Sequence, residues 1–136
     1  MPPKQRESRQ KTLEQVVAEL NLFPLEAFLF VTEGLTFTAE RHHGPRSSPD
    51  QNRHVTGQQL CEGLRDYALQ KYGMLAGTVL RRWGLRSTLD FGRIVYALID
   101  AGFFGKTDTD SIEDFRDVYD FRAAFDGAYK IQLSPE

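Results

Sequence analysis

Glycine and capping residues divide this chain into short segments, and each segment carries one apolar stripe with helical spacing. The clearest segment covers residues 91–99, where apolar side chains recur at the i, i+3, i+4 and i+7 positions of one helix face. Ser87 before it is a preferred N-cap residue, and Gly102 after it is the residue type that most often ends helices. Because such a stripe is stable only when another element covers it, we expect the chain to fold around a helical core.

Other helix starts and ends are also marked in the sequence. A capping box, in which two side chains satisfy free backbone N–H groups, is expected at two starts: Thr12–Gln15 and Thr56–Gln59. Pro24 favours a third start, because its fixed φ suits the first helical turn. The longest helices are therefore predicted at residues 24–43 and 57–72. The predicted helix ends are Gly44-Pro45, Gly73 and Gly84.

The length of 136 residues fits one domain, and the 40% of apolar residues can supply its core. We predict a mainly α fold of five to six helices over residues 12–133, with a helix-turn-helix-like hairpin. Residues 1–11 are predicted to form a flexible N-terminal tail, and residues 44–55 an exposed loop. The predicted core residues are Leu25, Phe28, Leu29, Leu64, Ala68, Leu75, Val79, Leu80, Trp83, Phe91, Ile94, Val95, Leu98 and Ile99.

The segment 111–126 leaves two structures open. A helix, the favoured interpretation, would turn four side chains inward: Phe115, Val118, Arg122 and Phe125. Alternatively, the stretch "DVYDF" forms a short strand that pairs with "GFFGK" in a C-terminal β-hairpin.

Charge and composition limit the classes of function that this chain can have. The net charge is -2, but residues 53–93 carry +4 between acidic segments on both sides. This basic middle is compatible with local anion contact, yet it is not the strongly basic footprint of a dedicated nucleic-acid-binding protein. A single cysteine excludes an internal disulfide, and no apolar run approaches the roughly 20 residues of a membrane span. We therefore predict a cytoplasmic protein with no membrane segment.

The stretch from Val79 to Phe104 has the spacing of a helix-turn-helix. If it read DNA, the first turn of its second helix, residues 88–90, would face the base edges. Four arginines would then contact phosphates: Arg81, Arg82, Arg86 and Arg93. Leu89 and Asp90 are poor partners for base edges, however, and the acidic residues after Lys106 repel phosphate. A structural hairpin is the preferred interpretation, and contact with nucleic acid or the ribosome is the alternative.

Metal and thiol chemistry form a third, lower alternative. The weak candidate ligands are His42, His54 and Cys61, which lack the paired close spacing typical of zinc sites. Cys61 could act as a nucleophile with His54 as its base, but it lies on an apolar helix stripe, where cysteines are usually inert. Nucleotide-binding, metalloprotease, nucleophile-elbow and C-x-x-C motifs are absent from the sequence. No catalytic residue, metal or cofactor is therefore predicted.

The C-terminal part of the chain combines aromatic and acidic residues. Most of the rings are expected to complete the core, and any that stay exposed would invite a protein partner or a second copy of the chain. The candidate contact residues are Phe103, Phe104, Tyr119, Phe121 and Phe125. Together with the arginine-bearing hairpin, they lead us to predict a non-catalytic binding module that acts through protein–protein contacts.

Three strings in the sequence, "GQQLCEGLRDYA", "RRWGLRSTLDFGRIVYALIDAG" and "EDFRDVYDF", resemble an uncharacterised bacterial protein family known by a placeholder locus name. The resemblance covers the chain from about Pro24 to Phe121. It implies a compact bacterial domain. The family has no established activity, cofactor or catalytic residues, so the resemblance implies no site residues for this chain.

Overall fold

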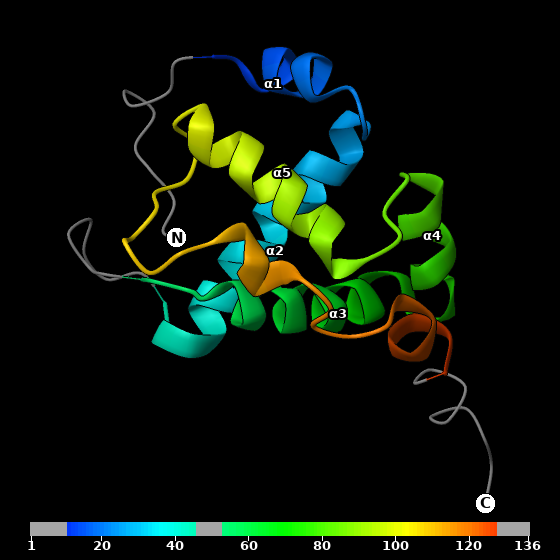
Figure 1. Cartoon of the computed structure of the whole chain (residues 1–136). Helices are drawn as coiled ribbons and strands as arrows, with labels where there is room; N and C mark the ends of the chain where they lie inside the picture. Colours follow the sequence, from blue (N-terminus) through cyan, green and yellow to red (C-terminus); the bar gives the residue numbers. More distant parts are fainter. Residues whose placement is uncertain (1–10, 46–52, 128–136) are drawn as a thin grey trace, which may run out of the picture.

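The computed structural model describes residues 11–45 and 53–127, and it confirms a mainly helical domain (Figure 1). The described residues form five α-helices: α1 (Leu13–Leu20), α2 (Leu25–His43), α3 (Gly57–Tyr72), α4 (Ala76–Arg82) and α5 (Thr88–Asp100). Three shorter helical turns complete them: the 3₁₀ turns η2 (Gly73–Leu75) and η3 (Ile112–Phe115) and the π-helical turn η4 (Arg122–Gly127). The two longest helices are those that the sequence predicts.

The helix boundaries follow the local signals in the sequence. Thr12 and Thr56 each accept a hydrogen bond from the backbone N–H three residues later, and both predicted capping boxes are complete. A third capping box joins Ser87 and Asp90 at the start of α5. The glycines at the predicted ends have positive φ angles, which glycine adopts without steric cost: Gly44, Gly73, Gly84 and Gly102.

A sharp turn joins α1 to α2. Asn21 adopts the left-handed conformation with φ of 53°, and Pro24 then caps the start of α2. No single helix among the described residues is long and apolar enough to span a membrane. The pair α1 and α2 reaches that length and composition only when taken together, and it is bent by 118°.

In Figure 1, α3 runs along the lower part of the domain, α2 descends from α1 to α3, and α5 crosses α2. Glycines allow the close approach of α2 and α3. A Cβ atom on Gly63 would lie 1.8 Å from Thr38 Oγ1, and one on Gly34 would lie 2.1 Å from Leu64 Cδ2. Phe30 of α2 then packs against the ring of Phe91 of α5 at 6.4 Å, which joins the three helices in one core.

After α5 the chain returns along α3, and its last described turn, η4, lies beside α4. In Figure 1 the orange segment η3 lies between α5 and α3, and η4 lies beneath α4. The buried Thr88 hydroxyl fixes this course, because it donates to the Phe115 carbonyl at 2.6 Å and accepts from the Val118 N–H at 3.1 Å. Gly92 makes room for Phe115, since a Cβ atom there would lie 2.9 Å from the Phe115 side chain.

The predicted core is wrong in the register of α2 and at η2. Leu29 and Leu75 are exposed, and four further predicted core residues are only half-buried: Leu25, Val79, Trp83 and Ile99. In α2 the buried side chains instead include Phe30 and Val31 beside Phe28. The reason is that apolar residues occupy most positions of "LEAFLFV", so the stripe alone does not define one face. Contacts with α3, α5 and α1 then decide which side is buried.

The predicted structure of residues 111–126 is also wrong. Neither one helix nor a strand forms in this described segment, which has two short turns and an irregular stretch between them. The capping box of Ser111 and Asp114 starts η3, and the extended backbone at Arg116 stops it. Phe115 and Phe125 are buried as expected, Val118 is half-buried, and Arg122 is exposed rather than inward. Side-chain anchoring on α5 therefore overrides the helical pattern.

Two predicted flexible regions fall largely outside the described residues. These are residues 1–10 of the expected N-terminal tail and residues 46–52 of the expected loop. Residues 128–133 of the expected domain also lie outside the described residues. The described end of the loop differs from the prediction, because Arg53 and Val55 are buried. Val55 belongs to the core cluster, so the chain is already packed before α3 begins.

The close packing of α2 on α3 gives a stability prediction for Gly63→Ala. Alanine is favoured over glycine in a helix by about 1 kcal/mol, but overpacking of a core costs about 1–3 kcal/mol. Because the new methyl group would lie only 1.8 Å from Thr38 Oγ1, the packing cost should reach the upper end of that range. We therefore expect the free energy of unfolding in urea to fall by about 1–2 kcal/mol. The exposed neighbour Glu62→Ala is the control, with a change within about 0.5 kcal/mol. A Gly63→Ala protein as stable as the control would contradict this packing.

Candidate functional site

The four predicted anion-contact arginines do not share one surface. Arg81 and Arg86 line the same cleft, whereas Arg82 projects from the exposed side of α4 and does not line it. Arg93 lies on α5 and forms an ion pair with Asp90. The hairpin therefore presents two of the four guanidinium groups together, and these two are the starting point of the site.

The cleft lies between α4, the turn after it and η4, and has a volume of about 470 Å³. Its lining residues are Arg81, Arg86, Asp120, Phe121, Arg122 and Asp126. A second hollow of about 330 Å³ shares Arg86, Asp120 and Phe121 with it, so that the two are continuous. Ser87, Asp117 and Tyr119 complete the second hollow. We name this composite site the arginine–aspartate cleft.

Two of the carboxylates in the cleft are engaged within the protein. Asp126 Oδ2 lies 3.3 Å from Arg81 Nη1, and Asp120 Oδ2 accepts the Ala123 N–H at 2.9 Å. Gly77 leaves the space for the first pair, because a Cβ atom there would lie 2.6 Å from Asp126 Oδ1. Arg86 and Arg122, by contrast, form no side-chain ion pair with any described residue. The cleft therefore offers two unpaired guanidinium groups.

An aromatic ring forms the floor of the arginine–aspartate cleft. Phe121 is 7% exposed, and its ring packs against Phe91 at 5.4 Å and Phe125 at 5.1 Å. The ring is fixed by these neighbours, so it presents a rigid apolar surface between the charged groups.

The candidate aromatic contact residues mostly complete the core and do not form an exposed patch. Phe104, Phe121 and Phe125 are buried, and Phe103 is half-buried. The half-buried Tyr119 donates its hydroxyl hydrogen bond to the Cys61 carbonyl at 2.7 Å, and burial raises its pKa well above the usual value. The accessible parts of this set are thus the half-buried Phe103 and Tyr119 and the edge of Phe121 that lines the cleft.

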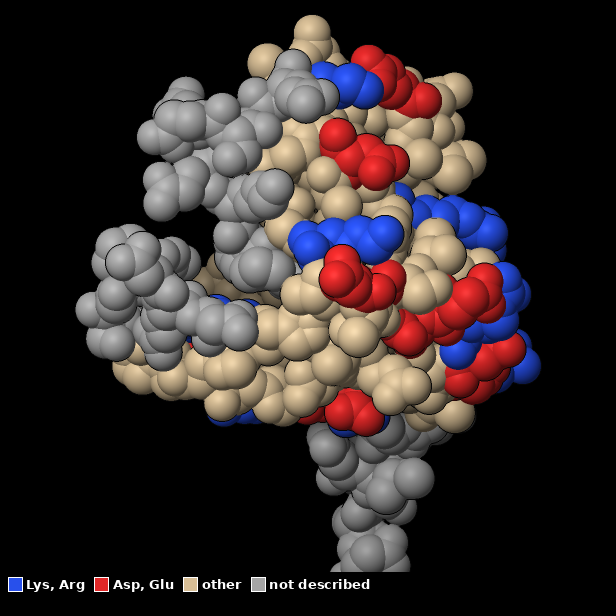
Figure 2. Space-filling model, turned by 60° about the vertical axis from the view of Figure 1, so that its left-hand side comes forward, with Lys and Arg blue, Asp and Glu red and all other residues tan. Residues whose placement is uncertain are grey.

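The start of α5 is not free to enter a DNA groove. Thr88 is buried under the segment that follows η3, and Leu89 is half-buried. Asp90 is 7% exposed and accepts the Arg86 N–H at 2.8 Å and the Ser87 N–H at 3.3 Å, and the second bond belongs to the capping box of α5. This buried, capped start of the helix differs from what base readout requires. On the face shown in Figure 2, which turns the left-hand side of Figure 1 forward, basic and acidic side chains are interspersed.

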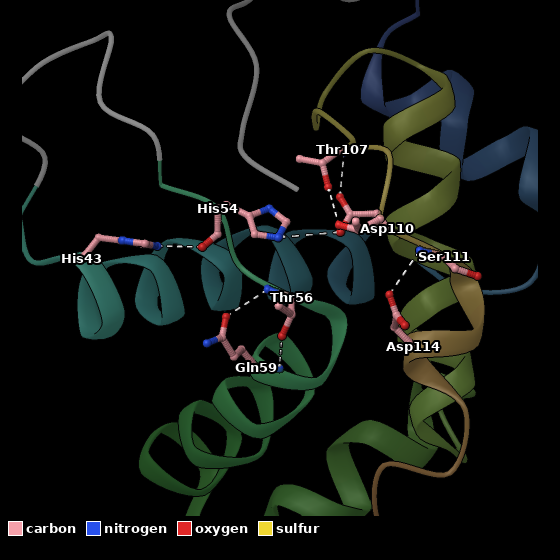
Figure 3. A network of polar contacts seen from close by, with 9 residues as sticks. His43, His54, Thr56, Gln59, Thr107, Asp110, Ser111 and Asp114 are labelled. Carbon is pink, nitrogen blue, oxygen red and sulfur yellow. Dashed lines mark hydrogen bonds and ion pairs between the residues drawn. The ribbon is translucent and has the colours of Figure 1, made fainter.

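The histidines belong to a polar network near the start of α3 (Figure 3). His43 Nε2 lies 2.6 Å from the His54 carbonyl, and His54 Nε2 lies 3.9 Å from Asp110 Oδ1. The buried Asp110 also accepts the Thr107 N–H at 2.8 Å, which closes the turn before η3. His42 is exposed. In the part of the chain that the structure describes, no three His, Cys, Asp or Glu side chains gather in a geometry suited to a metal ion.

Cys61 is fully buried in the core of the domain. Burial, and secondarily the nearby Glu62 charge, raises the pKa of its thiol to about 12. A thiol of this kind is protonated at neutral pH, whereas nucleophilic cysteines need a lowered pKa and some exposure. The environment of Cys61 is therefore that of a packing residue.

The comparisons with known proteins give no guide to the site. No protein-family model, curated protein or solved structure matches the chain. The resemblance to a bacterial family of unknown function stays a prediction, and function is inferred from the cleft alone.

Sequence reasoning missed half of the cleft. It selected Arg81, Arg86 and Phe121 of the cleft lining, but it assigned Arg122 to the core. It named the acidic aromatic tail as a contact surface without singling out Asp120 or Asp126. Asp126 lies 45 residues after Arg81, and no local pattern indicates that they meet. The one available signal was the charge complementarity between the basic middle and the acidic C-terminal segment.

The burial of Cys61 gives a reactivity prediction. In the native protein at pH 8, we expect a thiol reagent such as DTNB to react with much less than one equivalent over an hour, because the thiolate fraction at a pKa of about 12 is very small. One full equivalent should react after unfolding in guanidinium chloride, as measured by absorbance at 412 nm. Rapid stoichiometric labelling of the folded protein would contradict the buried, protonated state.

Proposed function

We propose that this chain is a non-catalytic protein-binding module and that the arginine–aspartate cleft receives an acidic segment of its partner. The observation that supports this proposal most directly is the pair of unpaired guanidinium groups, Arg86 and Arg122, beside the Phe121 ring. A guanidinium group can bind a carboxylate through two parallel hydrogen bonds, and arginine and aromatic residues dominate the binding energy of protein interfaces.

The mixed charge of the cleft favours a peptide over a nucleic acid. A phosphate backbone carries a negative charge at every nucleotide, and Asp117, Asp120 and Asp126 would repel it. A peptide presents carboxylates at separate positions and backbone N–H donors between them. The carboxylates suit Arg86 and Arg122, and the N–H donors suit the aspartate oxygens.

The groups in the cleft are also suited to binding more than to catalysis. Its described lining holds no His, Cys or Lys, and arginine stays protonated at physiological pH. The Ser87 hydroxyl, a possible nucleophile by residue type, is engaged in the capping box of α5. The remaining charged side chains have the chemistry to hold and orient a ligand.

Binding of a defined acidic peptide tests the proposal. The probe is a fluorescein-labelled nine-residue peptide with glutamates at alternate positions and one central phenylalanine. Its binding to the protein is measured by fluorescence anisotropy. Exposed ion pairs contribute up to about 1 kcal/mol, so Arg86→Gln and Arg122→Gln should each raise the Kd about fivefold. The double variant should raise the Kd by a factor close to the product of the two single-variant factors.

Arg116→Gln is the matched control, because Arg116 is exposed and pairs with Glu113 at 2.7 Å outside the cleft. Its Kd should stay within a factor of two of that of the unmutated protein. A loss equal to that of Arg86→Gln would show that only overall charge matters. No peptide binding by the unmutated protein, together with tight and steeply salt-dependent binding of duplex DNA, would refute the proposal in favour of nucleic acid.

A further inference from the structure

Tyr119, which lines the arginine–aspartate cleft, also contacts an arginine of α3. The guanidinium carbon of Arg65 lies 5.7 Å from the centre of the Tyr119 ring, within the range of a cation–π contact. The ring is fixed, because its hydroxyl donates to the Cys61 carbonyl and because it stacks on Phe121 at 6.2 Å. An arginine that is not part of the cleft lining therefore lies directly next to the cleft.

A carboxylate joins Arg65 to a second arginine, on α2. Asp66 Oδ1 accepts from Arg65 Nε at 3.0 Å, and Asp66 Oδ2 accepts from Arg41 Nη1 at 2.6 Å. Partial burial acts to raise the pKa of Asp66, but the hydrogen bonds from both guanidinium groups bring this pKa below its usual value. Asp66 is therefore ionised near neutral pH. We name the three residues the Arg41–Arg65 cluster.

Both arginines of the cluster keep donors that a partner can use. Within the described residues, Arg65 forms hydrogen bonds only through Nε and Arg41 only through Nη1. Their side chains are 36% and 40% exposed, respectively. The Arg41 guanidinium lies over the Phe37 ring at 5.4 Å, as that of Arg65 lies over Tyr119. Stacking uses the flat face of a guanidinium group, so the N–H groups at its edge stay available to a carboxylate.

The Arg41–Arg65 cluster has mixed charge, like the cleft. Two guanidinium groups share the single Asp66 carboxylate, which leaves positive charge in excess between them. The exposed Glu62 precedes Arg65 by three residues on α3 and forms no ion pair with a residue that the structure describes. A phosphate backbone would be repelled by Glu62 and Asp66. A peptide, by contrast, can place one carboxylate at the arginines and a backbone N–H at Glu62.

We infer that the acidic partner segment bound in the arginine–aspartate cleft continues across Tyr119 and places a further carboxylate on the Arg41–Arg65 cluster. This inference rests on the proposed function, since it extends the same bound segment. The route is continuous, because Arg86 and Tyr119 line one hollow and Tyr119 contacts Arg65. Asp66 then connects Arg65 to Arg41. An extended peptide presents every second side chain to the same face, so glutamates at alternate positions can meet successive arginines.

A longer peptide tests this extension. The nine-residue peptide is lengthened by six residues at each end, roughly 20 Å per end in extended form, with glutamates at alternate added positions. A neutral version carries glutamine in place of each added glutamate. In fluorescence anisotropy, the acidic version should bind the unmutated protein about tenfold more tightly than the neutral version, because two more exposed ion pairs form. Equal Kd values for the two versions would overturn the inference.

Substitution of the two arginines locates the added contact. Arg41→Gln and Arg65→Gln should each raise the Kd of the acidic version about threefold and leave that of the neutral version within a factor of two. If these arginines only tied α2 to α3, they would not distinguish the two peptides. Arg116→Gln is the matched control and should leave both Kd values within a factor of two. An equal loss in the control would overturn the inference.

Far-UV circular dichroism verifies that each variant is folded. Arg41→Gln keeps the test decisive if Arg65→Gln does not fold, because Arg41 is exposed on α2 and does not line the cleft.

The nine-residue peptide separates this inference from the proposed function. If it binds with the expected dependence on Arg86 and Arg122, but the acidic extension gives no gain or a gain that Arg41→Gln does not reduce, only the extension is wrong. If the nine-residue peptide does not bind, the proposed function is wrong, and the inference that rests on it is wrong as well.

Discussion

The attachment of the C-terminal segment to α5 by the Thr88 hydroxyl is the interaction on which the rest of this structure depends. This hydroxyl donates to the Phe115 carbonyl and accepts from the Val118 N–H, and it is fully buried. Without it the Phe115 carbonyl, which is buried, and the Val118 N–H, which is partly buried, would lose this partner, at a cost of up to about 1–3 kcal/mol each. The same hydroxyl thus closes α5 to external ligands and sets the direction of the chain that follows.

The candidate cleft is a consequence of that attachment. Phe121, Arg122 and Asp126 come after the fixed point at Val118, and the chain has to leave it toward α4 for Asp126 to reach Arg81. The ring of Phe121 is then held by Phe91 of α5 and Phe125 of η4. Two regions that are distant in sequence, the arginine-bearing hairpin and the acidic aromatic tail, meet in this way at one site.

The sequence predicts those parts of the fold that depend on residues close together in the chain. The capping boxes at Thr12 and Thr56, the N-cap at Ser87 and the stop at Gly44 need only a few neighbours, and all of them form. The register of α2 could not be predicted in the same way. Phe28, Leu29 and Phe30 are equally apolar, and only the packing of α3 and α5 determines that Leu29 stays exposed.

The candidate site was predictable only in part, for a related reason. The basic charge of Arg81 and Arg86 is visible in the sequence, as is their position near a helical hairpin. Their neighbours Asp120 and Asp126 come from a segment whose helical pattern is overridden by the Thr88 attachment. A pattern of local periodicity carries no information about such a long-range hydrogen bond, so the cleft appears only when the fold is known.

The free energy of unfolding of Thr88→Val tests this account most directly, because valine keeps the shape of threonine but removes the hydroxyl. We expect a loss of about 2–4 kcal/mol in urea, as two backbone groups lose their partner. Faster hydrogen exchange of the Val118 amide should accompany this loss. Thr36→Val, at an exposed position of α2, is the control and should change stability by less than about 0.5 kcal/mol. A Thr88→Val protein as stable as the control, with the Val118 amide still protected, would contradict the account.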